Sequence, residues 1–282
     1  MIKSITVTNR LNQSIKLELS YPEKSGFLVQ SISGLGPVKS DINSKELATG
    51  DGSIYNSARM NSRNIVMDLK FLWSPTIEAV RLLSYRYFPI KQRIRIMIET
   101  DSRTCYIYGY VESNEPDIFS SESGTIVSII CPDPYWIGSS DDARMSAWVG
   151  GLSFPLTFPM TFSRQAKEII VNNEGDTYTP LLMVFYGPAI NPRITNVTTN
   201  SFIQVNKELL VGEKLTITTS YGKKKVILTD TDGVETNVNQ FIDKDSVFWG
   251  LIPGDNTIHY EAEAGEDQAN VTINWDKKYA GV

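Results

Sequence analysis

The sequence has few of the side chains that most often bind metal ions or act as catalytic bases. Among 282 residues there are one histidine, His259, and two cysteines, Cys105 and Cys131. A zinc site needs about four nitrogen or sulfur ligands, and a catalytic triad needs a histidine beside its nucleophile. His259 alternates with Ile258 and Tyr260, which places it on the polar face of a predicted strand. The sequence therefore predicts no metal site and a solvated histidine.

Long hydrophobic runs and a secretory signal are also missing. The longest apolar runs fall far short of the ~20 residues that a membrane-spanning helix needs, so we expect no membrane insertion. Residues 1–9 contain no apolar stretch followed by a small-residue cleavage site. We therefore expect the chain to be made and assembled in a cytoplasm, where both cysteines stay reduced.

Positive charge is not in excess. The chain has 27 Lys and Arg against 32 Asp and Glu, a formal net charge of −5. Its two basic clusters, 91–95 and 223–225, are short. A surface that grips nucleic acid needs clustered Lys and Arg to displace counterions from phosphates. The composition therefore argues against specific nucleic-acid binding.

Motifs of catalysis and of cofactor binding are absent from the sequence. It contains no Gly-x-Ser-x-Gly elbow, and its nearest approach to a nucleotide loop, 34–36, leads into Pro37 and no helix. The two carboxylates of a glycoside hydrolase come together only in the folded chain, so the sequence alone does not identify them. Asp68 and Asp133 are nominal candidates, although a solvated or turn-capping role suits both better. We predict that the protein is not an enzyme and binds no cofactor.

A proline-rich stretch, 131–138, divides the chain. Pro132 and Pro134 each lack a backbone donor and fix their own φ, so a central strand cannot continue through them. We place the domain boundary here and expect Tyr135 and Trp136 to pack the junction. The predicted parts are an N-terminal domain, a linker or strap containing two Phe-Pro pairs, and a C-terminal domain, which cover residues 1–136, 137–163 and 164–282.

The sequence of the N-terminal part predicts a mostly antiparallel sheet or sandwich with one helix. Apolar and polar residues alternate in several segments, as in strands with one buried face. Ser74 and Pro75 form a helix start, with Ser74 as the expected N-cap, and the helix should end near Phe88, before Pro89. The C-terminal part has short predicted strands between glycine- and proline-containing turns and no helix, which indicates a β-sandwich.

A polar segment, 38–60, interrupts the N-terminal strands. It is either an exposed loop or a two-stranded arm that turns at Asp51 and Gly52. Segments of this length are uncommon in compact domains unless they serve an interaction. We therefore predict a subunit contact at the arm, formed by Gly50, Asp51 and Gly52 with Arg59 and Arg63 at the base.

Several short motifs, in order along nearly the whole chain, carry a family resemblance. With them the sequence resembles the distal tail proteins of long-tailed, siphovirus-type bacteriophages, often described as phage tail components. The motifs lie at residues 32–36, 50–53, 62–65, 74–75, 87–89, 108–111, 131–135, 152–159, 173–176, 187–192, 212–213 and 252–256.

The resemblance implies a structural virion protein at the tail tip. Its N-terminal domain, a β-sandwich-like fold with one helix and an extended hairpin, would form a homohexameric ring that continues the tail tube. Its C-terminal domain would be a galectin-like or carbohydrate-module-like β-sandwich outside the ring. The implied partners are the tail tube protein, the tail-associated tip protein and receptor-binding or baseplate proteins, with DNA passing through the ring without specific binding.

Two other functions compete with this hub. The C-terminal sandwich could be a carbohydrate-binding module that contacts the host cell wall, since sugar sites use exposed aromatic rings. A cell-wall hydrolase is the third reading. The aromatic candidates for a sugar site are Trp148, Tyr178, Tyr221, Trp249, Tyr260 and Trp275.

Overall fold

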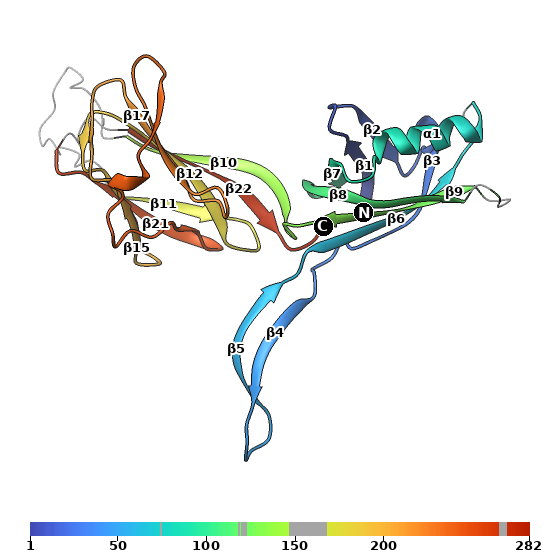
Figure 1. Ribbon diagram of the computed structural model, residues 1–282, viewed down its shortest axis with the longest axis horizontal. Coiled ribbons are helices and arrows are strands. Elements are labelled where there is room, and N and C mark those ends of the chain that lie inside the picture. The colour runs from blue at the N-terminus through green and yellow to red at the C-terminus, as the bar shows by residue number, and fades with distance from the viewer. Residues whose placement is uncertain (74, 118, 120–122, 147–167, 265–269) are drawn as a thin grey trace, which may run out of the picture. The chain divides into compact units, whose positions relative to one another are not determined.

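The structure is a computed structural model that describes residues 1–73, 75–117, 119, 123–146, 168–264 and 270–282. These residues form two compact units, one of Met1–Ser139 with Tyr279–Val282 and the other of Ser140–Lys278. Both are built from antiparallel strands, and one α-helix occurs in the described part of the chain, which confirms the predicted mainly β fold (Figure 1). In the same part, no helix has the length and apolar character needed to cross a membrane.

Unit 1 contains one bent sheet, and its middle strand, β8, pairs with strands of both halves of the sheet. The long strand β8 pairs with β7 through Thr104–Tyr110 and with β9 through Tyr110–Asp117. Gly109 lies where these two pairings meet. A Cβ at this position would lie 2.5 Å from Ile129 Cγ2, so the position needs glycine. The strand order is β3 (Phe27–Ser33), β6 (Arg63–Phe71), β9 (Gly124–Cys131), β8 (Thr104–Asp117), β7 (Arg93–Thr100), β1 (Ile2–Thr8) and β2 (Ser14–Glu18), with the 3₁₀ turn η1 (Pro22–Lys24) between β2 and β3.

The core of unit 1 follows from strict alternation along these strands. In β6 the side chains of Ile65, Met67 and Leu69 are fully buried, and their neighbours face outward. Helix α1 (Ile77–Tyr87) covers this core with Val80, which is also fully buried. The bent sheet therefore keeps one face for the core and leaves the other face open.

The helix starts later than the sequence suggested. Its N-cap is Thr76, which has extended backbone angles and accepts a hydrogen bond at Oγ1 from Ala79 N at 3.1 Å. The predicted cap, Ser74, lies outside the described residues. Ala79 N–H has no acceptor within the helix, and the Thr76 hydroxyl accepts from it as a serine cap would do. The helix therefore begins at Ile77. It ends at Tyr87, before Pro89, as expected.

The predicted polar arm is a two-stranded ribbon. Strand β4 (Ser40–Glu46) pairs with β5 (Ser53–Met60), and within the described residues neither strand pairs with any other. Figure 1 shows the ribbon extending away from the sheet of its own unit. The extended hairpin expected from the sequence is therefore present.

Unit 2 contains two antiparallel sheets around a second core. One has the order β19 (Glu235–Asn237), β18 (Lys225–Thr229), β17 (Lys214–Thr218), β12 (Thr179–Tyr186) and β22 (Asn270–Tyr279), next to β10 (Trp136–Ser146). The other has the order β11 (Glu168–Asn173), β21 (Gly254–Glu261), β14 (Arg193–Asn196) and β15 (Ser201–Gln204). Buried residues of both sheets, such as Met183 and Ile258, share one cluster, so this unit is a β-sandwich. Smaller elements are β13 (Ala189–Ile190), β16 (Glu208–Leu209), η2 (Asn239–Phe241) and β20 (Gly250–Leu251).

The division between the units differs in detail from the predicted one. It follows Ser139, where the sequence placed the boundary at residue 136, and residues 137–146 of the expected linker are strand β10 instead. The rest of that linker, including the Phe-Pro strap, lies outside the described residues. The last four residues, Tyr279–Val282, join unit 1, which no sequence pattern indicated.

Candidate subunit-contact site

The arm has one apolar and one polar face. Along β4 every second residue shares a face, so Ser40, Ile42 and Ser44 lie on one side. Their partners on β5 are the largely apolar residues Met60, Ala58 and Tyr55. A bulge between Asn43 and Ser44 shifts the register by one residue, and this shift brings Tyr55 to the same face as Ala58 and Met60. We call Ile42, Tyr55, Ala58 and Met60 the apolar arm face.

The opposite face of the arm is polar. Asp41 lies opposite Arg59, with Oδ2 and Nε 3.9 Å apart, and Asn43 lies opposite Ser57. An exposed pair at this distance contributes little stability. The arm is thus amphipathic, although a two-stranded ribbon has no interior of its own.

Among the described residues of its own unit, nothing covers the apolar arm face. Every residue from 41 to 60 is exposed, including Ile42 at 67% and Tyr55 at 64%. An isolated two-stranded ribbon is only marginally stable in water. A ribbon with an uncovered apolar side is therefore suited to docking on another surface.

Four of the five predicted contact residues lie on the arm. Gly50, Asp51 and Gly52 are at its tip, where Gly52 has φ +91° and open space around its Cα. Arg59 is near the base on the polar face and is 82% exposed at its side chain. These four residues occupy one projecting element.

Arg63 is not on that surface. Its side chain is 1% exposed, and its hydrogen bonds to the described residues run to backbone carbonyl oxygens. Nη1 donates to Gly34 O and Gly36 O, Nε to Pro134 O and Nη2 to Ala280 O, at distances between 2.5 and 2.8 Å. Predicting Arg63 as a contact residue was therefore wrong, because its donors are used within its own chain.

Arg63 fastens both ends of the arm to the rest of unit 1. The chain leaves the sheet after Ser33 and returns to it at Arg63, so the bond from the guanidinium to Gly36 O ties the second root of the arm to the first. The same group holds Pro134, in the proline-rich stretch, and Ala280, near the C-terminus. We call this set of contacts the Arg63 clasp.

Electrostatics and close packing complete the clasp. Burial lowers the pKa of Arg63 and raises the pKa of the neighbouring Cys131 thiol to about 12. Trp136 is fully buried and donates from Nε1 to Leu35 O at 3.3 Å, and Val282 N donates to the same oxygen at 3.2 Å. The sequence signal that could have found this cluster is the glycine pair 34–36 together with the prolines at 132 and 134.

Half of the aromatic candidates for sugar binding are not available. Trp249, Tyr260 and Trp275 lie in the core of unit 2, no more than 6% exposed. Trp148 lies outside the described residues. Tyr178 and Tyr221 are exposed, at 46% and 97%. The three buried rings have a packing role, as large aromatic side chains commonly do.

The single histidine has an acidic environment without the geometry of a metal site. His259 Nδ1 is 3.5 Å from Glu168 Oε1, and Nε2 is 3.9 Å from Glu261 Oε2. Across the described residues, no group of three or more His, Cys, Asp or Glu side chains could hold a metal ion. The histidine therefore lies beside two carboxylates, Glu261 on its own strand β21 and Glu168 on the neighbouring strand β11.

Comparison with known proteins finds a family model that is similar to the C-terminal part. Residues 174–279 match the family model described as "Siphovirus-type tail component, C-terminal domain". A search of curated proteins found no match.

Solved structures of phage proteins share the fold of the whole chain. The SPP1 Dit (gp 19.1) protein, described as a paradigm of hub adsorption apparatus in Gram-positive infecting phages, is 14% identical, with a TM-score of 0.68 over 97% of this chain and 98% of that chain. A chain of the phage P2 baseplate in its activated conformation with Ca is 10% identical, with a TM-score of 0.56 over 100% of both chains. The same baseplate with Sr gives 9% identity and a TM-score of 0.54, over 96% of this chain and 97% of that chain. Residues 174–279 are therefore similar to the C-terminal domain of siphovirus-type tail components, and the chain as a whole shares the fold of the SPP1 Dit protein.

Proposed function

We propose that this chain is a structural hub at the distal end of a phage tail. In this role unit 1 assembles into the ring that continues the tail tube, and the hub joins the tube to the tip and host-adhesion proteins. The fold shared with a phage hub protein over nearly the whole chain supports this proposal. No catalytic step and no cofactor are part of it.

The observation that carries the proposal is the uncovered apolar arm face. In a ring each copy touches the next through two different surfaces, because the contact is head-to-tail. A projecting ribbon whose apolar residues are exposed and uncovered by the described part of their own unit supplies one such surface. We assign the apolar arm face, with Gly50, Asp51 and Gly52 at its tip and Arg59 on its polar side, to the contact with the neighbouring copy.

The net charge of the chain suits a passage for DNA. Each copy carries a formal charge of −5, so a hexameric ring of the kind implied by the family resemblance is strongly acidic as a whole. A channel of the same sign as DNA repels phosphates and lets the duplex slide, whereas a basic channel would bind them. Unit 2, in this proposal, lies outside the ring and contacts baseplate or receptor-binding proteins.

The arm is tested by weakening one of its faces at a time. The double variant Ile42→Ser/Tyr55→Ser removes the largest side chains of the apolar arm face and is expected to weaken self-association about tenfold or more. The matched control is Ile54→Ser, because Ile54 pairs with Lys45 on the polar face and is 54% exposed. Sedimentation velocity over a concentration series measures both.

The two results have different meanings for the proposal. Loss of assembly in Ile42→Ser/Tyr55→Ser, with Ile54→Ser like the wild type, supports the arm contact. Equal assembly of all three proteins contradicts it. The thermal unfolding of each variant serves as the folding control, and no change is expected because the substituted residues are exposed.

A further inference from the structure

Tyrosine and arginine side chains form an array on the open face of β7 and β8. The register pairs Tyr108 with Arg95 and Tyr110 with Arg93, and Tyr106 is the next outward residue of β8. The residues between them, such as Ile94 and Ile107, are buried in the core, so the array points outward. We call Arg93, Arg95, Tyr106, Tyr108 and Tyr110 the Arg–Tyr face.

Both guanidinium groups of this face rest on aromatic rings. Arg93 Cζ is 3.8 Å from the ring centroid of Tyr108, and Arg95 Cζ is 5.8 Å from that of Tyr106. The two rings pack edge to face, with centroids 5.6 Å apart. Stacking holds each guanidinium in place, and its N–H groups, apart from the buried Nε of Arg95, remain able to donate. Less side-chain entropy is therefore lost when a partner binds.

Within the described residues, neither arginine forms an ion pair with a carboxylate. The acid nearest along β7 is Glu99, and it already accepts from Ser4 Oγ at 3.0 Å and lies 3.5 Å from Lys16 Nζ. Two positive charges are therefore presented without compensation. Tyr and Arg are also the residue types that most often carry the binding energy of protein interfaces.

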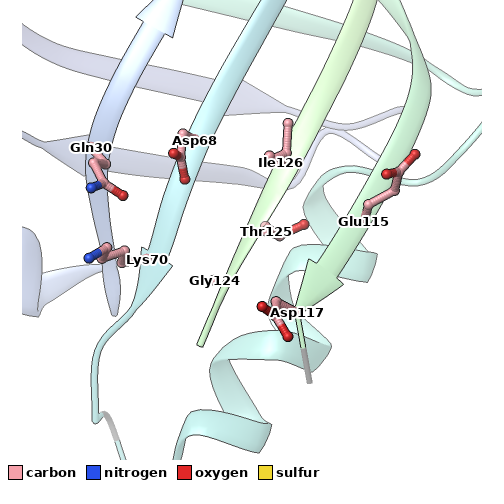
Figure 2. Close-up of a pocket in the computed structure, with 8 residues that line it drawn as sticks. All are labelled: Gln30, Asp68, Lys70, Glu115, Asp117, Gly124, Thr125 and Ile126. Carbon is pink, nitrogen blue, oxygen red and sulfur yellow. The ribbon is translucent and has the colours of Figure 1, made fainter. Parts of the chain in front are cut away.

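The same sheet carries an acidic groove on β6 and the far end of β8. Figure 2 shows the carboxylates of Asp68, Glu115 and Asp117 around a pocket of about 290 Å³. Asp68 and Glu115 have no hydrogen-bond or ion-pair partner among the described residues. The remaining lining residues are Gln30, Lys70, Gly124, Thr125 and Ile126.

We infer that the Arg–Tyr face of one copy binds the acidic groove of the next copy. This inference rests on the proposed ring, for which it supplies a second pair of contact surfaces besides the arm. The two surfaces are opposite in charge and are different parts of one chain, the first on β7 and the near half of β8 and the second on β6 and the far end of β8. A head-to-tail contact requires two such different surfaces. The arginines donate to Asp68 and Glu115 of the neighbour, and the tyrosine rings exclude water around these bonds.

Charge also decides between this partner and a nucleic acid. Proteins that hold DNA electrostatically contact about six to ten phosphates, and the Arg–Tyr face offers two guanidinium groups on a chain with a net charge of −5. Binding to a protein surface that bears carboxylates needs only a few well-placed arginine–carboxylate pairs. The second copy is favoured because its own groove supplies them.

Reciprocal charge reversal in the full-length chain tests this contact. Arg93→Glu/Arg95→Glu and Asp68→Lys/Glu115→Lys each make the two surfaces repel, so each protein alone should fall to the mass of a single chain in light scattering. In an equal mixture, the reversed face of the first variant meets the reversed groove of the second. The unchanged Arg–Tyr face of the second variant meets the unchanged groove of the first, so both kinds of contact become attractive again. We expect the mixture to recover the wild-type mass with the two chains in equal numbers, which also shows that both variants are folded.

The control and the overturning results are distinct. Arg10→Glu/Lys223→Glu changes charge at two exposed positions outside both surfaces and should assemble like the wild type. If both reversed proteins keep the wild-type mass while Ile42→Ser/Tyr55→Ser dissociates, this contact is wrong and the proposed ring stands. If the wild type itself is a single chain at every concentration, the ring and this contact fail together. Binding of a short DNA duplex by the wild type, lost in Arg93→Glu/Arg95→Glu, would also overturn it.

Discussion

The guanidinium of Arg63 lies against the indole of Trp136, with Cζ 5.5 Å from the ring centroid. Both side chains are buried, although one follows the arm and the other lies in the proline-rich stretch. Together they join segments that are far apart in the sequence, since Arg63 bonds to Gly34 O on one side and to Ala280 O on the other. The arm roots, the start of β10 and the C-terminus thus depend on a single cation.

Arg63→Ala is expected to destabilise unit 1 by about 3 kcal/mol or more. The change removes four hydrogen bonds and leaves their carbonyl acceptors poorly satisfied in a buried place. Calorimetric unfolding measures the loss. Arg59→Ala is the matched control and should change stability by no more than about 0.5 kcal/mol, because its ion pair with Asp41 is exposed. Equal effects of the two changes would contradict the clasp.

Gly34→Ala should be far more damaging than Gly52→Ala. Both glycines have positive φ, +81° and +91°, so alanine is strained at both positions, by roughly 1 kcal/mol or more. Only at Gly34 does the new Cβ also meet a neighbour, lying 2.0 Å from Asn64 O, whereas the space at Gly52 is open. The midpoint of urea unfolding compares the two. A Gly34→Ala protein as stable as Gly52→Ala would show that the arm root is not packed as described.

Trp136→Phe is expected to cost about 1–3 kcal/mol, because it removes a buried hydrogen-bond donor and leaves unfilled space beside Arg63. Trp136 is fully buried, while Trp73 is 77% exposed. Trp73→Phe should therefore leave stability within about 0.5 kcal/mol of the wild type. Thermal unfolding of the two variants decides the point, and a neutral Trp136→Phe would argue against the packing of the junction.

The Cys131 thiol gives a pH-dependent prediction. Burial raises its pKa in the folded protein to about 12, from an ordinary value of 9.0. Between these values the unfolded chain loses the proton and the folded chain keeps it, so stability is intact below about pH 9 and falls as the pH rises further. The slope attributable to this group approaches 1.4 kcal/mol per pH unit.

Urea unfolding at a series of pH values from 8 to about 10.5 measures this slope, in wild type and in Cys131→Ala. The variant starts from a lower stability but should lack this part of the pH dependence, so slopes are compared instead of absolute values. Parallel slopes would contradict the assignment. The native thiol should also resist labelling by a disulfide reagent at pH 8 and react on unfolding.

Much of the fold could be predicted because alternation and breakers act locally. Ile65, Met67 and Leu69 alternate with outward residues, and this pattern alone gives a strand with one buried face. Pro89 ends the helix and the prolines at 132 and 134 end strand β9 for the same reason, the missing backbone donor. The arm was visible as a polar segment too long for a simple turn.

The candidate site was less predictable because its contacts are long-range. Arg63 was expected at the surface because a charged residue at the base of a polar arm is usually solvated. Its burial depends on carbonyl oxygens from three other segments, one of them at Ala280, 217 positions away. The return of the C-terminus to unit 1 depends on the same contact. Neither could be inferred from spacing or periodicity.

The most direct test of the hub is to image the purified full-length protein by negative-stain electron microscopy and weigh the same sample by light scattering. We predict closed rings with a central channel and a mass that is a whole-number multiple of one chain. Ile42→Ser/Tyr55→Ser should give no rings under the same conditions. Single chains at every concentration, or open filaments in place of closed rings, would contradict the account.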